Sequence, residues 1–178
     1  MPVDQHDGGA ADLEAAARTI VLQRLTASAQ TRAQLEATLA RRGVRPEIAK
    51  TVLDRLTEVG LVDDVAFAHA WVQSRHAGRG LSARALEHEL RQRGIPPEVI
   101  TEAVATVDSA AERQRAADLV ARVMRRTAGL AVDVRRRRLT AMLARKGYPP
   151  AVAYAVVHAA LRGQESVDAE LADPEFVD

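Results

Sequence analysis

Apolar residues recur at intervals of three and four along most of this chain, which is the spacing of one face of an α-helix. Several of these apolar runs are followed by a glycine, as at Gly43, Gly60 and Gly94. Glycine is typical of the position just after a helix, where the backbone becomes left-handed. The pattern predicts an all-α protein with nine helices, over residues 13–25, 32–42, 46–59, 64–76, 83–93, 97–107, 111–127, 134–146 and 150–161.

Polar residues mark the starts of several of these helices. Thr31 and Gln34 have the spacing of a capping box, in which each side chain accepts a hydrogen bond from the other residue's backbone N–H. Pro46 suits the first turn of a helix, where its missing N–H costs nothing. Asp63 is placed to cap the helix that follows it. These signals fix where the predicted helices begin.

One sequence pattern occurs three times. The chain reads Leu39-Ala-Arg-Arg-Gly43, then Leu90-Arg-Gln-Arg-Gly94, then Leu143-Ala-Arg-Lys-Gly147, with the glycines 51 and 53 residues apart. A leucine stands eight residues before each glycine and a proline three residues after it. These are Leu35, Leu86 and Leu139, and Pro46, Pro97 and Pro150.

A repeat of this length indicates one small supersecondary unit that packs on its neighbours. We expect three tandem three-helix repeats, over residues 13–60, 61–108 and 109–162, forming an elongated, curved molecule. Residues 1–12 are polar and residues 163–178 are acidic, so both ends are predicted to be disordered.

Composition excludes several classes of protein. The chain has no cysteine, which rules out disulfides and thiolate metal sites. Aromatic residues make up only 3% of it, so a large aromatic-lined ligand pocket is not expected. We find neither a secretory signal nor an apolar run that could span a bilayer, and we expect a soluble cytoplasmic protein.

The net charge of +1 hides an uneven distribution. Residues 1–16 and 163–178 contain ten acids and no lysine or arginine, whereas residues 17–162 hold all 25 basic residues and 14 acids. Only Lys50 and Lys146 are lysine. A GC-rich genome would explain arginine over lysine, but not the acidic ends. The basic body indicates an anionic partner, either protein or nucleic acid.

No arrangement of residues suggests catalysis or a cofactor. The five histidines lack the spacing of metal ligands. Asp63 and Asp64 are better explained as a helix start than as paired catalytic carboxylates. Trp71, the single tryptophan, is expected in the core. We therefore predict a protein that is not an enzyme and needs no cofactor.

Arginines cluster around the second predicted helix of each repeat. Such a basic strip, present once per repeat, suits a polymer with a repeating anionic surface, such as a phosphate backbone or a helical protein filament. The other interpretation is a solvated face with local ion pairs. The candidates are Arg41 and Arg42 in the first repeat, Arg75, Arg79, Arg84, Arg91 and Arg93 in the second, and Arg135, Arg136, Arg145 and Lys146 in the third.

The middle of the chain resembles the RecX family, bacterial modulators of the RecA recombinase. The resemblance extends over residues 17–161, and its most specific motifs lie between Gly60 and Ile95. They are Gly60-Leu-Val-Asp-Asp64 with an aromatic at Phe67, Trp71-Val-Gln-Ser-Arg75, Gly78-Arg-Gly80 and Glu89-Leu-Arg-Gln-Arg-Gly-Ile95.

The resemblance implies a monomer that lies along the groove of the RecA–DNA filament and inhibits RecA's ATPase, strand-exchange and coprotease activities. Binding roles transfer best to the middle repeat, because the first repeat lacks the Asp-Asp and tryptophan motifs. Arg42 and Arg93 stand where the family often has lysine. The alternative is a protein of helix-turn-helix-like modules that binds DNA directly, with strong salt dependence in the absence of RecA.

Overall fold

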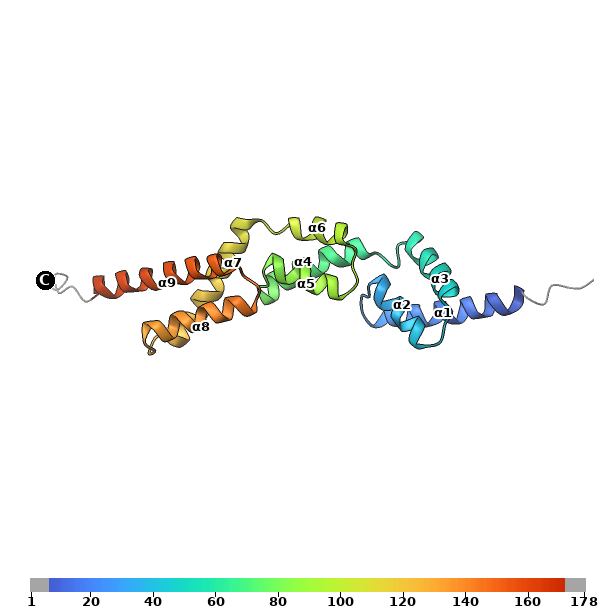
Figure 1. Ribbon diagram of the computed structural model, residues 1–178, viewed down its shortest axis with the longest axis horizontal. Helices are drawn as coiled ribbons and strands as arrows, with labels where there is room; N and C mark the ends of the chain where they lie inside the picture. The colour runs from blue at the N-terminus through green and yellow to red at the C-terminus, as the bar shows by residue number, and fades with distance from the viewer. Residues whose placement is uncertain (1–6, 172–178) are drawn as a thin grey trace, which may run out of the picture. The chain divides into compact units, whose positions relative to one another are not determined.

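The computed structural model describes residues 7–171, and this part of the chain contains helices and no β-strand (Figure 1). The predicted all-α class and the three three-helix repeats are therefore confirmed. The elements are α1 (Asp7–Ala27), α2 (Arg32–Arg41), α3 (Pro46–Glu58), α4 (Asp64–Arg79), α5 (Ala83–Gln92), α6 (Pro97–Ala105), α7 (Ser109–Met124), the 3-10 helix η1 (Arg125–Thr127), α8 (Val132–Arg145) and α9 (Pro150–Leu171).

The sequence repeat corresponds to a structural one. The second helices of the three repeats are α2, α5 and α8, and each is followed by a glycine with positive φ: 77° at Gly43, 74° at Gly94 and 86° at Gly147. Two leucines one turn apart face inward on each of these helices. All six, Leu35, Leu39, Leu86, Leu90, Leu139 and Leu143, are fully buried.

The chain forms two compact units that do not coincide with the three repeats. One comprises Met1–Val72 with His88–Ala103, and the other comprises Gln73–Glu87 with Val104–Asp178. The first contains the core of α1, α2 and α3, and the second contains the core of α7, α8 and α9. The middle repeat is divided between them. The predicted repeat boundaries, and the elongated, curved outline, stay predictions of the sequence.

Both terminal helices are longer than predicted. Helix α1 begins at Asp7, within the segment expected to be disordered, because its alanines favour helix. Helix α9 continues past Gly163 to Leu171, since one glycine costs only about 1 kcal/mol within a helix. The rest of the two predicted disordered ends, residues 1–6 and 172–178, lies outside the described residues. No helix within residues 7–171 has the length and apolar composition needed to cross a membrane.

Candidate functional site

The N-terminus of α2 is hydrogen-bonded to residues of the second repeat, and we call such a contact between two repeats a joint. The Thr31 hydroxyl donates a hydrogen bond of 2.7 Å to the carbonyl oxygen of Arg93. The Asp64 carboxylate accepts one of 2.8 Å from the backbone N–H of Arg32. Thr31 also forms the predicted capping box with Gln34. The free N–H groups at this helix start are therefore bound by side chains of two different repeats.

The start of α5 forms an equivalent joint with the third repeat. Here the backbone N–H of Ser82 donates to the carbonyl oxygen of Lys146 at 3.0 Å. The Glu112 carboxylate accepts a hydrogen bond of 2.7 Å from the backbone N–H of Ala83. In both joints, one repeat supplies a carboxylate from its first helix and a carbonyl from its glycine turn. Each joint lies within one compact unit.

Glycine is required in these turns for a steric reason as well as for its positive φ. A Cβ on Gly94 would lie 2.4 Å from the Cβ of Ala33. A Cβ on Gly147 would lie 2.6 Å from both the Cβ of Ala85 and the Oγ of Ser82. Around Gly43 the same atom would meet nothing within 4 Å. Within residues 7–171, the second and third glycine turns therefore have a neighbouring helix packed against them, and the first does not.

Arg93, which precedes the glycine of the second repeat, is part of this packing. Its guanidinium lies 3.6 Å from the centroid of the Trp71 ring, a cation–π contact. The indole N–H of Trp71 donates to the Glu89 carboxylate at 2.8 Å, and Phe67 stacks on the indole with ring centroids 5.7 Å apart. The prediction that Trp71 is a core residue is wrong, because Trp71 is half-buried beneath an arginine.

Lys146 occupies the matching position in the third repeat and is also engaged. Its ammonium donates a hydrogen bond of 2.5 Å to the carbonyl oxygen of Arg79. Partial burial lowers the pKa of Lys146, and the positive charges of Arg79, Arg115 and Arg122 lower it further. Arg93 and Lys146 thus have contacts within the protein, whereas Arg42, their equivalent in the first repeat, is exposed.

The four consecutive arginines of α8 differ in their exposure to solvent. Arg135 is only 6% exposed, and its Nη2 donates to the side-chain oxygen of Gln164 at 2.5 Å. It cannot contribute to a surface strip, because the helix turns this one position toward the core. Arg136 is half-buried and pairs with Asp133 on its own helix. Arg137 and Arg138 are exposed, as a run of four arginines on a helix requires.

Seven exposed arginines remain on or next to the second helices, and we call them the exposed arginine set. Five of them, Arg42, Arg84, Arg137, Arg138 and Arg145, make no side-chain hydrogen bond or ion pair with the described residues. Arg79 is exposed but lies at the end of α4, and Arg75 is half-buried on that helix. The full set is Arg41 and Arg42 beside α2, Arg84 and Arg91 on α5, and Arg137, Arg138 and Arg145 on α8.

Sequence reasoning missed the two joint carboxylates. Asp63 caps α4 as predicted, accepting from the N–H of Ala66 at 2.8 Å, but Asp64 caps α2 instead of its own helix. Two consecutive aspartates indicated a second role for one of them, because capping α4 needs only one carboxylate. Glu112 has no such marker in the sequence.

Profiles of the RecX family match three segments of the chain. The first three-helix domain of RecX matches residues 17–56, the second matches residues 63–104 and the third matches residues 111–157. The regulatory protein RecX of Thermobifida fusca is 47% identical over 175 residues, which cover 97% of this chain and 94% of that protein. The regulatory protein RecX of Streptomyces coelicolor is 48% identical over 160 residues, covering 90% of this chain and 85% of that protein.

Solved structures show the same fold. The crystal structure of RecX from Lactobacillus salivarius superposes with a TM-score of 0.75 at 15% identity, covering 84% of this chain and 97% of that one. A second crystal structure, of a regulatory protein RecX, gives a TM-score of 0.77 at 22% identity over 88% of this chain and 79% of that one. At these identities the likeness concerns the fold alone.

Proposed function

Because this chain belongs to the RecX family of regulatory proteins, we propose that it binds the RecA–DNA filament and inhibits the ATPase, strand-exchange and coprotease activities of RecA. One observation supports the proposal most. Exposed arginines recur on or beside the second helix of all three repeats, and at least one in each repeat (Arg42, Arg84 or Arg145) makes no side-chain hydrogen bond or ion pair with the described residues. Arginines kept out of the joints remain available to an external anionic partner.

Several weak contacts on one chain suit a filament. Each repeat presents arginines to successive subunits or phosphates, and the second contact follows the first at a high effective concentration. Overall affinity then exceeds that of any single repeat. A ligand spanning several RecA protomers would also hold them in one relative orientation. This mechanism uses no catalytic group.

The experiment compares two triple variants that remove the same charge. R42A/R84A/R145A takes one exposed, unpaired arginine from each second-helix region, and R18A/R24A/R113A takes three exposed arginines from the first helices α1 and α7. We expect the former to weaken inhibition of the RecA ATPase by more than about tenfold, because charged contacts are lost in every repeat. The control set should change inhibition far less at both low and high salt.

Equal inhibition by wild type and R42A/R84A/R145A, with the fold intact by circular dichroism, would contradict the proposal. Equal weakening by the two triple variants would mean that only overall charge matters. In that outcome the second-helix arginines have no special role. The matched design separates the two results because net charge is identical.

Direct DNA binding remains a second candidate, favoured by one groove on the third repeat. Tyr154 on α9 is 56% exposed and lines a hollow of about 410 Å³ together with Arg137 and Thr140 of α8. An exposed aromatic ring beside arginines suits stacking with an unpaired base. Fluorescence anisotropy of a labelled single-stranded oligonucleotide, without RecA, would test it. Binding that is lost in Y154A and kept in Y154F would support this function.

A further inference from the structure

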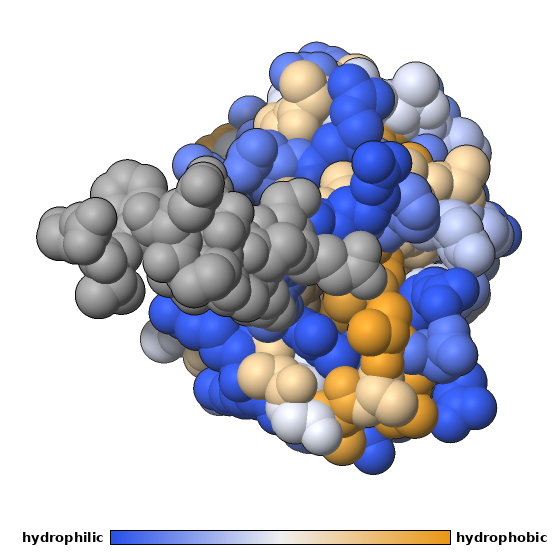
Figure 2. Space-filling model, turned by 90° about the vertical axis from the view of Figure 1, so that its left-hand side faces the viewer, coloured by the Kyte–Doolittle hydropathy of each residue, from blue (hydrophilic) through white to orange (hydrophobic). Residues whose placement is uncertain are grey.

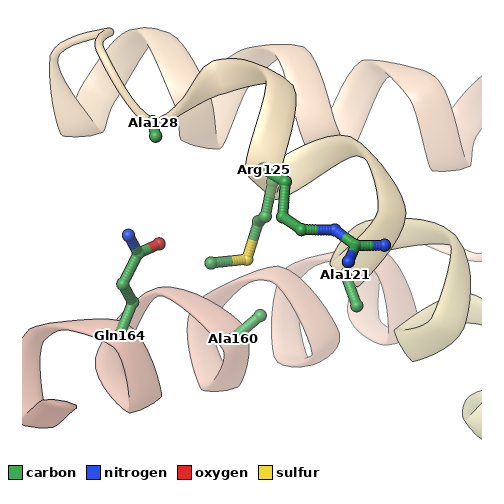
Figure 3. Close-up of a pocket in the computed structure, with 6 residues that line it drawn as sticks. Ala121, Arg125, Ala128, Ala160 and Gln164 are labelled. Carbon is green, nitrogen blue, oxygen red and sulfur yellow. The ribbon is translucent and has the colours of Figure 1, made fainter.

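The hollows on the two compact units differ in chemistry. On the side of the second unit where α8 and α9 lie, apolar side chains reach the surface among charged ones (Figure 2). A hollow of about 580 Å³ beside η1 and α9 is lined largely by alanines and Met124 (Figure 3). A smaller hollow on the first unit, of about 280 Å³, is lined by four polar residues, and we call it the polar hollow. They are Gln34, Glu89, Gln92 and Arg93.

One aromatic side chain holds the two charged residues of the polar hollow in place. The Glu89 carboxylate on α5 accepts a hydrogen bond of 2.8 Å from the indole N–H of Trp71. The guanidinium of Arg93, just after α5, lies over the same indole, 3.6 Å from the ring centroid. From α2, Gln34 contributes an amide whose oxygen accepts from the N–H of Thr31 at 3.1 Å. The polar hollow therefore combines a fixed carboxylate acceptor and a fixed guanidinium donor with two amides.

These groups restrict what the polar hollow can bind. Glu89 repels an anion such as phosphate, and Arg93 repels a cation such as a lysine side chain. An apolar group would displace water from the polar residues without replacing its hydrogen bonds, which loses affinity. The polar hollow therefore suits a neutral group with both donors and acceptors. A nucleobase is such a group, and the volume is close to the roughly 300 Å³ at which small-molecule sites begin.

Glu89 selects among the bases. A carboxylate only accepts hydrogen bonds, and guanine is the base with two adjacent donors on one edge, N1–H and N2–H. The neighbouring edge of guanine carries the O6 and N7 acceptors that arginine binds. In an unpaired nucleotide both edges are accessible. We propose that the polar hollow binds a guanine base, with Glu89 accepting from N1–H and N2–H and Arg93 donating to O6 and N7.

This site adds sequence preference to binding through the arginines. Arg91 of the exposed arginine set lies on α5, the helix that carries Glu89 and Gln92. Contacts to phosphates fix the position of a strand, whereas contacts to bases distinguish one sequence from another. The proposal goes beyond inhibition of RecA, because the guanine site needs no RecA. It is also independent of Tyr154, which lies on the third repeat.

Trp71 provides a local probe of the polar hollow in the full chain. It is the single tryptophan, and it contacts two of the residues that line the hollow. Its fluorescence is followed while the protein is titrated with oligo-dT strands that carry one central dG, dA, dC or deoxyinosine. We expect the dG strand to bind about tenfold more tightly than the others, which is within the discrimination given by a bidentate contact. Deoxyinosine should bind as weakly as dA, because it lacks the 2-amino donor to Glu89.

Matched variants separate base recognition from charge. E89Q removes the carboxylate but retains a side-chain oxygen that can accept from Trp71, and E98Q removes an exposed acid on α6. Both variants lose one negative charge, so both should bind every strand slightly more tightly. We expect only E89Q to lose the preference for dG. Y154A should keep that preference, so that the guanine site and the groove beside Tyr154 succeed or fail separately.

Guanosine monophosphate distinguishes the source of the base. Binding weaker than that of the dG strand would assign the site to a DNA strand, and binding as tight or tighter would assign it to a free guanine nucleotide. Equal or undetectable responses to the dG, dA and dC strands would overturn the proposal. A preference for dG that E89Q retains would overturn it as well. Neither result depends on whether the protein inhibits RecA.

Discussion

At the scale of single residues, equivalent positions of the repeat have different roles. Arg42, Arg93 and Lys146 all precede a repeat glycine, yet Arg93 covers Trp71 and Lys146 binds the Arg79 carbonyl. Arg42 is exposed, and no helix of the described residues packs against the glycine turn beside it. The sequence repeat thus shows that the three positions are equivalent. The contacts that each residue makes depend on which neighbouring repeat packs against it.

The glycines allow this difference to be measured. Gly43 and Gly94 have nearly the same φ, 77° and 74°, so alanine is strained at both, by about 1–2 kcal/mol. Only at Gly94 would the new Cβ collide with Ala33, at 2.4 Å. We expect G94A to lower the free energy of unfolding clearly more than G43A, as measured by urea denaturation. Equal losses of unfolding free energy in G94A and G43A would mean that the packing around Gly94 accommodates the extra methyl group without further destabilisation.

Tyr148 provides a pH-dependent prediction. Its hydroxyl donates to the Gly80 carbonyl, and burial raises its pKa from 10.0 to about 12, with the Glu112 charge acting in the same direction. The folded protein therefore holds this proton more tightly than the unfolded chain does. The free energy of unfolding should fall as pH rises from about 10 to 12, the interval between the two pKa values.

Comparison with Y148F isolates this effect. That variant has no phenol at this position, so the part of the decline caused by Tyr148 should disappear in urea titrations at several pH values. Y154F, which removes the other tyrosine, should keep it. A decline of equal slope in wild type and Y148F would contradict the assignment.

The residues that sequence reasoning misplaced share one physical cause. Trp71, Asp64 and Arg135 each interact with a group distant in sequence: the Arg93 guanidinium, the Arg32 N–H and the Gln164 amide. Helical periodicity gives the face on which a side chain lies, but it does not give what packs against that face. The leucines Leu86 and Leu90 were predictable because burial alone defines their role.

At the scale of helices, starts were more predictable than ends. The observed first residues of α2, α3, α4, α5 and α6 are those predicted, because caps and prolines act locally. Helix α1 is the exception, because it begins six residues before the predicted start, within an alanine-containing segment. Helix α9 begins at the predicted Pro150 but ends later than predicted, because the single Gly163 does not stop it.

The joint at the start of α2 gives a prediction at this scale. D64A removes the carboxylate that accepts from the Arg32 N–H, and D63A removes the cap of α4 itself. Each should cost roughly 0.5–2 kcal/mol, the usual range for a lost cap. Amide hydrogen exchange distinguishes them. Exchange should accelerate at Arg32 in D64A and at Ala66 in D63A, and the reverse pattern would show that the assigned caps are wrong.

At the scale of the whole molecule, the repeats are not independent. Each joint connects the second helix of one repeat to the first helix and glycine turn of the next, so stability depends on neighbours, as in other repeat proteins. The two compact units divide the middle repeat accordingly. The number and order of repeats were readable from the sequence. This division was not, since it arises from contacts between repeats.

The three repeats should share binding to the filament. Arg42, Arg84 and Arg145 lie in three different repeats and have no partner in common, so the effects of replacing them should add as free energies. If the whole molecule binds the RecA filament through all three, R42A, R84A and R145A should each weaken ATPase inhibition modestly. The triple variant should then multiply the three losses.

Raising the salt concentration should reduce the effects of R42A, R84A and R145A on ATPase inhibition by similar factors, because exposed charge contacts are screened to a similar degree. Raising the salt concentration should weaken wild type more than the triple variant, which has fewer charges left to screen. A single variant that reproduces the entire loss would place binding in one repeat, and the multivalent mechanism would be wrong. If all three repeats contribute to binding, the partner would explain why each repeat has a basic second helix, because a chain that contacts a polymer at several equivalent points needs the same basic helix at each point.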